Sequence, residues 1–291
     1  MLVACDKGPP PPPPPPAPAP GSGSATSTCE QLPFAASTPI PEASGAAWLD
    51  GKLVVVGDSG NHGAYGIVDP ETGATVEQGT LPLGTSIDDL EGLDARDGTL
   101  YGLTSPGWIL TWKRTATGFE LADGPYALGP IDLPPKSGIG DKPPQGNGMV
   151  CDAAVVNCGR NYEGLCLRPR PGTGDCTGYA LSKADGHLYC LTEHDGRLAI
   201  QRNHAIAVDR PGVVADCAFS ADGTLWAGNN LFGMSQVFRV DEARATVASI
   251  GPLGVGFPEV IAARGDLIYR MSDTGGSPSL MAKFRCTGKA R

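Results

Sequence analysis

The sequence repeats one short strand-type segment five times, and this repetition constrains the fold more than any other feature. Each copy has an apolar residue at its second position and a hydrogen-bonding or acidic residue at its seventh. Segments of this kind that recur at roughly 40 to 50 residues are typical of the blades of a β-propeller. The five copies are residues 52–58, 99–105, 187–193, 224–230 and 267–273.

We therefore predict an all-β fold: a single β-propeller of five blades spanning residues 29–288, with each copy as the second strand of its blade. The Gly- and Pro-rich segment 131–161 leaves a sixth, degenerate blade as an alternative. The last unit ends one strand short, and residues 30–34 form an outer strand without a blade of its own. We expect this N-terminal strand to close the ring in the last blade, as propellers do to avoid a free edge.

The N-terminus carries the signs of a lipid anchor. Leu2-Val3-Ala4-Cys5 fits a bacterial lipobox, so residues 1–5 are interpreted as a residual lipoprotein signal with Cys5 as the acylated residue. Residues 6–28 are rich in Pro, Gly and Ser and form a tether, which would be semi-rigid. We expect a lipid-anchored protein of the bacterial cell envelope that faces the periplasm or the exterior. The alternative is a chance match of four residues.

Cysteine usage indicates an oxidising compartment. The chain has nine cysteines, and eight remain for disulfides once Cys5 is set aside for the lipid. Close spacing and the positions of the two chain ends predict the pairs Cys29–Cys286, Cys151–Cys158, Cys166–Cys176 and Cys190–Cys217.

The charge of the chain limits its partners. A formal net charge of -9 argues against nucleic acid and anionic membrane surfaces, and it favours cations or cationic ligands. We expect a monomer. The motifs of serine hydrolases, P-loop proteins and zinc proteases do not occur in the sequence.

Five acidic residues open the first strand of their units, the strand that lines the central channel of a propeller. Converging carboxylates repel one another and require a cation, bound protons or hydrogen bonds. Ca²⁺ suits such a site because it accepts six to eight oxygen ligands in loose geometry. The alternative is that the acids hydrogen-bond the backbone of neighbouring blades. The candidate metal ligands are Glu42, Glu91, Glu163, Asp216 and Glu259.

A second set of polar residues follows the repeated strands and should emerge on one face of the propeller. Such residues could bind a ligand, or they could serve ordinary turns, which favour Asp, Asn, Ser and Gly for local reasons. The candidate ligand-binding residues are Asp58, Asn61, His62, Glu193, His194, Asn230 and Asp273.

Short motifs in these regions resemble known propellers. Residues 41–45 and 57–61, with Leu90-Glu91-Gly92-Leu93 and Tyr162-Glu163-Gly164-Leu165, are similar to exported bacterial propellers of the SdiA-regulated and phytase-like esterase families. Residues 215–228 bear a looser likeness to calcium-dependent lactonases of the gluconolactonase type. The resemblance implies a propeller whose channel acids hold calcium. The basic cluster that a phytase needs for phosphate is missing near these motifs.

Two functional hypotheses follow. The first is a lipid-anchored envelope propeller that binds a small molecule or protein partner, with Ca²⁺ as a possible channel ion. The second is a Ca²⁺-dependent hydrolase that acts on a phosphate ester, ester or lactone at the channel mouth. The sequence does not identify a nucleophile or a base that would decide between them.

Overall fold

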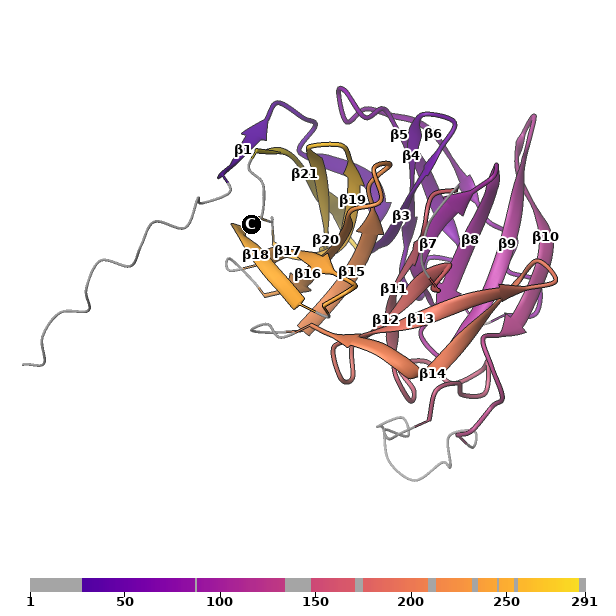
Figure 1. The fold of residues 1–291 in the computed structure, drawn as a ribbon. Coiled ribbons are helices and arrows are strands. Elements are labelled where there is room, and N and C mark those ends of the chain that lie inside the picture. The colour runs from indigo at the N-terminus through magenta and orange to yellow at the C-terminus, as the bar shows by residue number, and fades with distance from the viewer. Residues whose placement is uncertain are drawn as a thin grey trace, which may run out of the picture.

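Five antiparallel sheets surround a common axis (Figure 1). The computed structural model describes residues 28–86, 88–133, 148–170, 175–208, 213–231, 235–244, 246–253 and 256–287. The first strand of each sheet packs against the first strands of its two neighbours, and the last of them returns to the first. The chain is therefore a five-bladed β-propeller, as predicted, and the described residues contain no helix.

Each blade is a four-stranded sheet whose inner strand comes first in the sequence, and blades 1 to 5 follow the chain order. Blade 1 is β3 (Ala43–Leu49), β4 (Lys52–Gly57), β5 (Ala64–Val68) and β6 (Thr75–Thr80). Blade 2 is β7 (Leu90–Arg96), β8 (Thr99–Thr104), β9 (Trp108–Thr115) and β10 (Gly118–Ala127). Blade 3 is β11 (Tyr162–Leu167), β12 (Gly178–Ser182), β13 (His187–His194) and β14 (Arg197–Ala207). Blade 4 is β15 (Val213–Phe219), β16 (Leu225–Asn230), β17 (Gln236–Asp241) and β18 (Thr246–Pro252). Blade 5 is β19 (Phe257–Arg264), β20 (Leu267–Asp273), β21 (Pro278–Thr287) and β1 (Thr28–Leu32).

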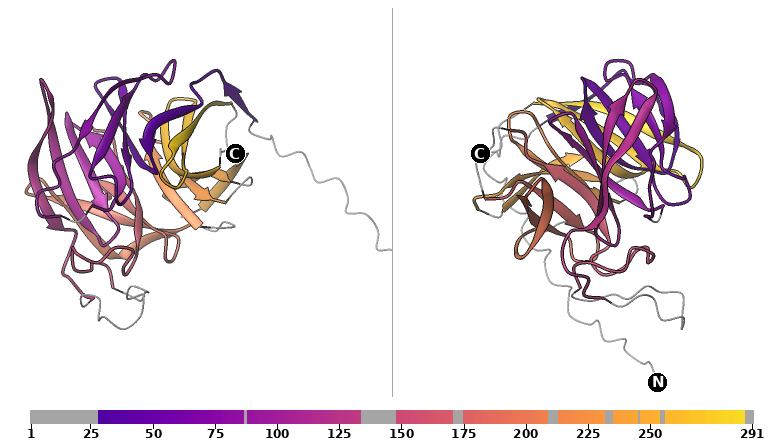
Figure 2. Two further views of the ribbon diagram at one scale, coloured as in Figure 1. Left: turned by 180° about the vertical axis from the view of Figure 1, so that it is seen from behind. Right: turned by 90° about the vertical axis from the view of Figure 1, so that its right-hand side faces the viewer.

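The two ends of the described chain meet in blade 5, which confirms the predicted closure. Strand β1 pairs antiparallel with β21 at the outer edge of the sheet, as the views in Figures 1 and 2 show. Strand β2 (Ser37–Pro41) also pairs with β21 before the chain enters blade 1. Cys29 lies opposite Cys286 and the two form a disulfide. Hydrogen bonds and a covalent bond thus hold the ring shut.

Asp-Gly pairs form several of the turns between the strands. At Asp50-Gly51, Asp97-Gly98 and Asp195-Gly196 both residues have a positive φ, between 50° and 79°. Two consecutive positive φ angles define the type I′ turn, whose twist matches the twist of the flanking strands. The local sequence therefore fixes where these hairpins reverse.

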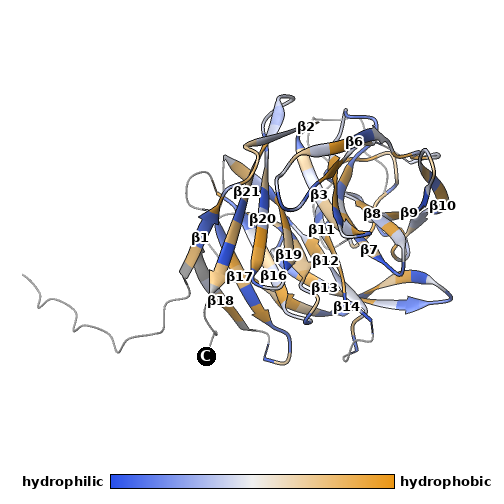
Figure 3. Cartoon of the chain, turned by 90° about the horizontal axis from the view of Figure 1, so that it is seen from above, coloured by the Kyte–Doolittle hydropathy of each residue, from blue (hydrophilic) through white to orange (hydrophobic). Residues whose placement is uncertain are grey.

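The hydrophobic core is divided into layers that lie between neighbouring blades. The strands carry many apolar residues, orange in Figure 3, and buried apolar side chains pack between the sheets. Between blades 1 and 2, for example, Val54 and Val56 pack with Leu100 and Trp112. Equivalent clusters of described residues fill the other four interfaces. Each blade is consequently stabilised by both neighbours, so the ring as a whole forms the cooperative unit.

Blade 3 corrects the alignment of one repeat. Residues 187–193 lie in β13, the third strand of the blade, and the second strand is β12. The connection between β11, which ends at Leu167, and β12, which begins at Gly178, is longer than in the other blades, and this length shifts the sequence match by one strand. The residues that follow β12, beginning with Lys183, therefore occupy the place predicted for Glu193.

Two of the four predicted disulfides are present and two are wrong. Cys151 pairs with Cys158, as Cys29 does with Cys286, whereas the structure pairs Cys166 with Cys217 and Cys176 with Cys190. Cys166 and Cys217 lie on β11 and β15, inner strands that pack side by side, so their bond links blades 3 and 4. Cys176 precedes β12 and lies beside β13, where Cys190 is placed. Pairing by closeness in the sequence overlooked these contacts between strands.

Four disulfides indicate an oxidising environment, extracellular or periplasmic. The described residues include no helix with the length and hydropathy needed to cross a membrane. The predicted lipidation site Cys5 and the tether lie outside the described residues.

Candidate functional site

Three glutamates occupy the same structural position near the start of three inner strands. Glu91 on β7, Glu163 on β11 and Glu259 on β19 each fall at a β-bulge, where the pairing with the next strand shifts by one residue. A bulge turns a side chain out of the regular alternation of a strand and is common beside functional sites. All three glutamates are buried. The bulge therefore directs three acids towards one end of the propeller.

The structure shifts the other two predicted ring acids out of this position. Blade 1 has Ser44 at its bulge and blade 4 has Ala215, so the predicted Glu42 lies two residues too early and Asp216 one residue too late. Asp89 in blade 2 corresponds to Glu42 in blade 1. The carbonyl oxygen of Glu42 accepts a hydrogen bond from Asp58 N, and that of Asp89 accepts one from Ser105 N. Each donor is the first residue after the second strand of its blade. Asp89 is buried, and the sequence analysis missed it.

Asp216 has a structural role between blades. Its carboxylate accepts hydrogen bonds from Cys217 N at 2.7 Å and from Ile261 N, on the next inner strand, at 3.0 Å. Burial raises the pKa of Asp216 well above its usual value. Asp94 makes the same kind of bond to Leu167 N at 2.6 Å, from blade 2 to blade 3. The alternative to metal binding, a hydrogen bond to the backbone of a neighbouring blade, is confirmed for Asp216.

A lysine lies among the acids. Lys183 follows β12 as Asp58 follows β4. The amide of Lys183 donates to the carbonyl oxygen of Asn161, just before β11, as the amide of Asp58 donates to that of Glu42, just before β3. Lys183 Nζ lies 2.8 Å from Glu163 Oε2. Burial lowers the pKa of Lys183, but the fields of Glu163, Glu259 and Glu91 outweigh this and raise it. The ammonium group is therefore a resident cation of the cluster.

We call the group of Asp58, Asp89, Glu91, Glu163, Lys183 and Glu259 the acidic mouth. Carboxylate oxygens of Asp58, Asp89 and Glu91 all lie within 4.8 Å of one another. These three residues come from blades 1 and 2, and electrostatic coupling connects them with Glu163 and Glu259. The acidic mouth thus combines side chains from blades 1, 2, 3 and 5.

The carboxyl groups of the acidic mouth resist ionisation. Burial, with the fields of neighbouring carboxylates, raises the pKa of Asp89 to about 7 and the pKa of Glu259 to about 7. The same causes raise the pKa of Glu91 and Glu163. Among the described atoms, Asp89 Oδ1 and Glu163 Oε1 are buried without a hydrogen-bond partner. A bound cation would remove both the repulsion and these unpaired acceptors.

Polar residues surround this cluster. Asn61 Nδ2 donates to Glu42 Oε2 at 3.0 Å, and Asn230 Nδ2 donates to Glu259 Oε1 at 2.5 Å. Asp273 acts on Glu259 electrostatically and raises its pKa. Of the residues predicted to bind a ligand, Asp58, Asn61, Asn230 and Asp273 therefore lie at or beside the acidic mouth.

The remaining three predicted residues do not share one location. His62 is exposed, and its backbone amide donates to Asp88 Oδ2 at 2.6 Å. Glu193 and His194 end the third strand of blade 3, where Glu193 pairs with Arg96 at the far end of the inner strand β7. The structure therefore does not bring Glu193 and His194 to the acidic mouth, whereas His62 bonds to Asp88, the sequence neighbour of Asp89.

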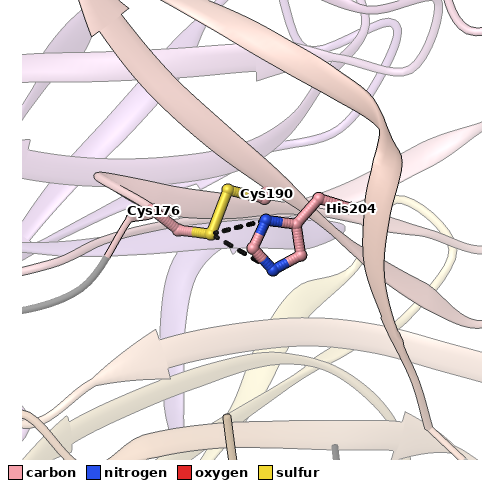
Figure 4. A group of neighbouring side chains, drawn as sticks. All are labelled: Cys176, Cys190 and His204. Carbon is pink, nitrogen blue, oxygen red and sulfur yellow. Dashed lines mark hydrogen bonds between the residues drawn. A yellow bond between two sulfur atoms is a disulfide. The ribbon is translucent and has the colours of Figure 1, made fainter. Parts of the chain in front are cut away.

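A second group of metal-binding residue types is already joined covalently. Cys176, Cys190 and His204 have ligand atoms within 4.8 Å of one another, but the two cysteines form a disulfide (Figure 4). His204 Nδ1 lies 3.7 Å from Cys176 Sγ. The disulfide leaves no thiolate for a metal, so the acidic mouth is the candidate site.

Comparisons with known proteins support the fold. No protein-family model matches the sequence, and a search of curated proteins gave no match. Among solved structures, glutaminyl cyclase from Myxococcus xanthus is 15% identical with a TM-score of 0.54, covering 90% of this chain and 98% of its own. A luciferin-regenerating enzyme is 11% identical with a TM-score of 0.50, covering 91% and 98%. A gluconolactonase from Xanthomonas campestris is 12% identical with a TM-score of 0.47, covering 86% and 88%.

At these identities the likeness shows the fold alone. The likeness to SdiA-regulated and phytase-like esterase propellers stays a prediction. The chain is a five-bladed β-propeller, and its likeness to these solved structures is a likeness of fold.

Proposed function

We propose that the chain is a ligand-binding propeller of the cell envelope whose acidic mouth holds Ca²⁺. One observation carries the proposal: three carboxylates from two blades converge within 4.8 Å. Asp89 is 1% exposed, and its Oδ1 has no hydrogen-bond partner among the described residues. Carboxylate oxygens that repel one another and lack hydrogen bonds destabilise the fold when they are buried. A bound divalent cation offsets this loss of stability.

The donor set suits calcium. Asp58, Asp89 and Glu91 would supply carboxylate oxygens, and water or a ligand would complete the six to eight oxygens that Ca²⁺ prefers. The absence of histidine and thiolate from the acidic mouth argues against zinc and copper, which prefer nitrogen and sulfur. Lys183 would remain beside the ion, where its ammonium group could bind an acceptor of the ligand.

Calorimetric titration of the chelator-treated protein with Ca²⁺ tests the metal. We expect binding and a melting temperature that rises with Ca²⁺ concentration, because an ion that binds only the folded state stabilises it. Asp89→Asn should abolish both effects, whereas Asp222→Asn, an exposed turn residue, should leave both unchanged. A melting temperature that stays constant across millimolar Ca²⁺ would contradict the proposal.

A second candidate is a Ca²⁺-dependent hydrolase of esters, phosphate esters or lactones. The pKa of about 7 at Glu259, which is not among the proposed calcium ligands, favours it, because a carboxylate that titrates near neutrality can act as a general base. Bound Ca²⁺ would polarise a carbonyl or phosphoryl oxygen. A hydrolase screen with and without chelator separates the candidates: chelator-sensitive turnover that Glu259→Gln removes would establish the enzyme.

The location is also part of the proposal. Four disulfides support an exported protein, and we propose that Cys5 carries the lipid. We further expect a monomer without affinity for nucleic acid. With a full leader sequence, the wild-type chain should partition into detergent and Cys5→Ser should not. Equal partitioning would contradict the anchor.

A further inference from the structure

Three arginines gather at the end of the propeller opposite the acidic mouth. A cavity of about 390 Å³ lies where the inner strands end, and residues from all five blades line it. Its lining includes three arginines, two aromatic residues and two aspartates. Both aspartates have partners, because Asp97 pairs with Arg170 and Asp94 accepts a hydrogen bond from Leu167 N. We call the arginines and the aromatic residues the arginine pocket: Trp48, Arg96, Arg170, Phe219 and Arg264. The volume is within the range of about 300 to 1,000 Å³ typical of small-molecule sites.

Two of the arginines are held in place by a shared carboxylate. Glu193 pairs with Arg96 Nη2 at 2.5 Å and also with Arg170 Nη2, while Arg170 Nη1 lies 3.2 Å from Asp97 Oδ2. The side chain of Arg96 is only 5% exposed, yet its Nε and Nη1 donors have no acceptor within the described chain. A guanidinium group has five N–H donors, so the ion pair with Glu193 orients Arg96 and leaves other N–H donors for a ligand.

The third arginine has no acidic partner. Among the described residues, Arg264 has no ion pair, and its guanidinium carbon lies 5.2 Å from the ring centre of Trp48. Arginine combines a bidentate fork for carboxylates with a flat face that stacks on aromatic rings. The free fork of Arg264 therefore lies beside an aromatic wall of the same pocket.

We propose that the arginine pocket binds a small organic anion, a carboxylate attached to a flat apolar body. Arg264 would hold the carboxylate with help from the free donors of Arg96. Trp48 and Phe219 would contact the flat body, and the lining residues Leu167 and Ala263 add apolar surface. This site is separate from the acidic mouth, and it does not depend on the calcium proposal.

Titration with benzoate, followed by calorimetry and by ligand-detected NMR in the presence of a chelator, tests the site. The chelator removes any ion that could bridge benzoate to the acidic mouth. We expect the wild type to bind benzoate, and to bind the uncharged isostere benzamide at least about tenfold more weakly, because charge-assisted hydrogen bonds are the stronger ones. No detectable benzoate binding, or equal binding of the two probes, would overturn the proposal.

Variants locate the site. Arg264→Gln should weaken benzoate binding at least about tenfold. Arg170→Gln, at the rim, should weaken it to a smaller extent. The matched control is Arg244→Gln, because Arg244 is 80% exposed on blade 4 and does not line the pocket. Equal benzoate affinity in Arg264→Gln and wild type, with both folded by near-ultraviolet circular dichroism, would place the ligand elsewhere and reject the inference.

Discussion

Lys183 Nζ lies 2.8 Å from Glu163 Oε2, inside a cluster of carboxylates that three other blades contribute to. The lysine already neutralises part of the charge that would attract a metal. Its field also acts on Asp58 and Glu91, two of the candidate ligands. The acidic mouth therefore has a fixed cation, and Ca²⁺ would be a second, exchangeable one.

Replacing this lysine should strengthen calcium binding. In Lys183→Met the repulsion between the ammonium group and Ca²⁺ is lost, and we expect the affinity to rise at least about tenfold. Isothermal titration calorimetry measures it. Lys113→Met, which removes an exposed lysine from blade 2, is the matched control and should leave the affinity unchanged. Weaker binding in Lys183→Met would show that the lysine supports the site instead of opposing the ion.

Without calcium, stability should fall as the pH rises towards 8. The carboxyl groups of Asp89 and Glu259 ordinarily titrate at 3.8 and 4.5, but in the folded chain each has a pKa of about 7. A group whose pKa is higher in the folded than in the unfolded state stabilises the fold fully at a pH below its unfolded-state pKa. This stabilisation is lost as the pH rises through its folded-state pKa. The loss therefore develops between about pH 4 and 8, on the order of a few kcal/mol.

Urea unfolding in chelator at a series of pH values measures this dependence. Glu259→Gln should flatten the curve because glutamine does not titrate. The ion-paired Asp69 and Asp123 have a lowered pKa and act below this window, so they do not mask the effect. Stability of the chelated protein that increases from pH 5 to 8 would be incompatible with buried, neutral carboxyl groups in the acidic mouth.

Gly228 makes room for a buried guanidinium group. A Cβ added there would lie 2.3 Å from Arg270 Nη1. Arg270 is fully buried and donates to the carbonyl oxygens of Val260, Asn229 and Pro258 at 3.0 to 3.2 Å. Gly228→Ala would displace these charged hydrogen bonds, so we expect a loss of about 3 kcal/mol or more.

Chemical denaturation of Gly228→Ala measures that loss. Gly129→Ala is the control, because a Cβ there would make only an ordinary contact of 3.4 Å with Ile200. It should change stability by less than about 1 kcal/mol. Similar stabilities for the two variants would mean that Arg270 can move aside without cost.

The closing disulfide should stabilise the fold more than the short loop disulfide does. Cys29 and Cys286 are 257 residues apart, whereas Cys151 and Cys158 are 7 apart. The chain-entropy relation gives about 5.6 kcal/mol for the first bond and about 2.4 kcal/mol for the second. Thermal unfolding of the double serine variants of each pair compares them. A larger loss from the Cys151–Cys158 pair would contradict closure as the main role of the terminal bond.

The fold could be predicted because a propeller repeats its local sequence in every blade. Asp-Gly turns and alternating apolar residues recur at blade spacing, and the missing last strand had an evident replacement near Cys29. Blade 3 broke this regularity. Its long connection between β11 and β12 places Lys183, not Glu193, at the site, and only the distance from Glu163 to the next turn hints at this in the sequence.

The sequence predicts only part of the candidate site, because it aligns the acids by residue type and does not reveal the register of the strands. Glu91, Glu163 and Glu259 share a bulge, but a bulge leaves no mark in a single sequence. The charge of Asp216 suggests a metal ligand, but its carboxylate accepts a hydrogen bond from the backbone amide of Ile261 in the next blade. Asp89, two residues before Glu91, belongs to the site through the fold alone.

The Cys29–Cys286 bond also decides how the protein would respond to a mechanical pull. A force applied through the residues before Thr28 enters at β1, and the disulfide passes it directly to β21. Without that bond the load would open the β1–β21 hydrogen bonds one after another, beginning at Thr28. With it, the strand cannot be peeled away while the sulfurs stay joined. Because β1 lies at the outer edge of blade 5, a tether would pull on the rim and leave both ends of the propeller open to solutes.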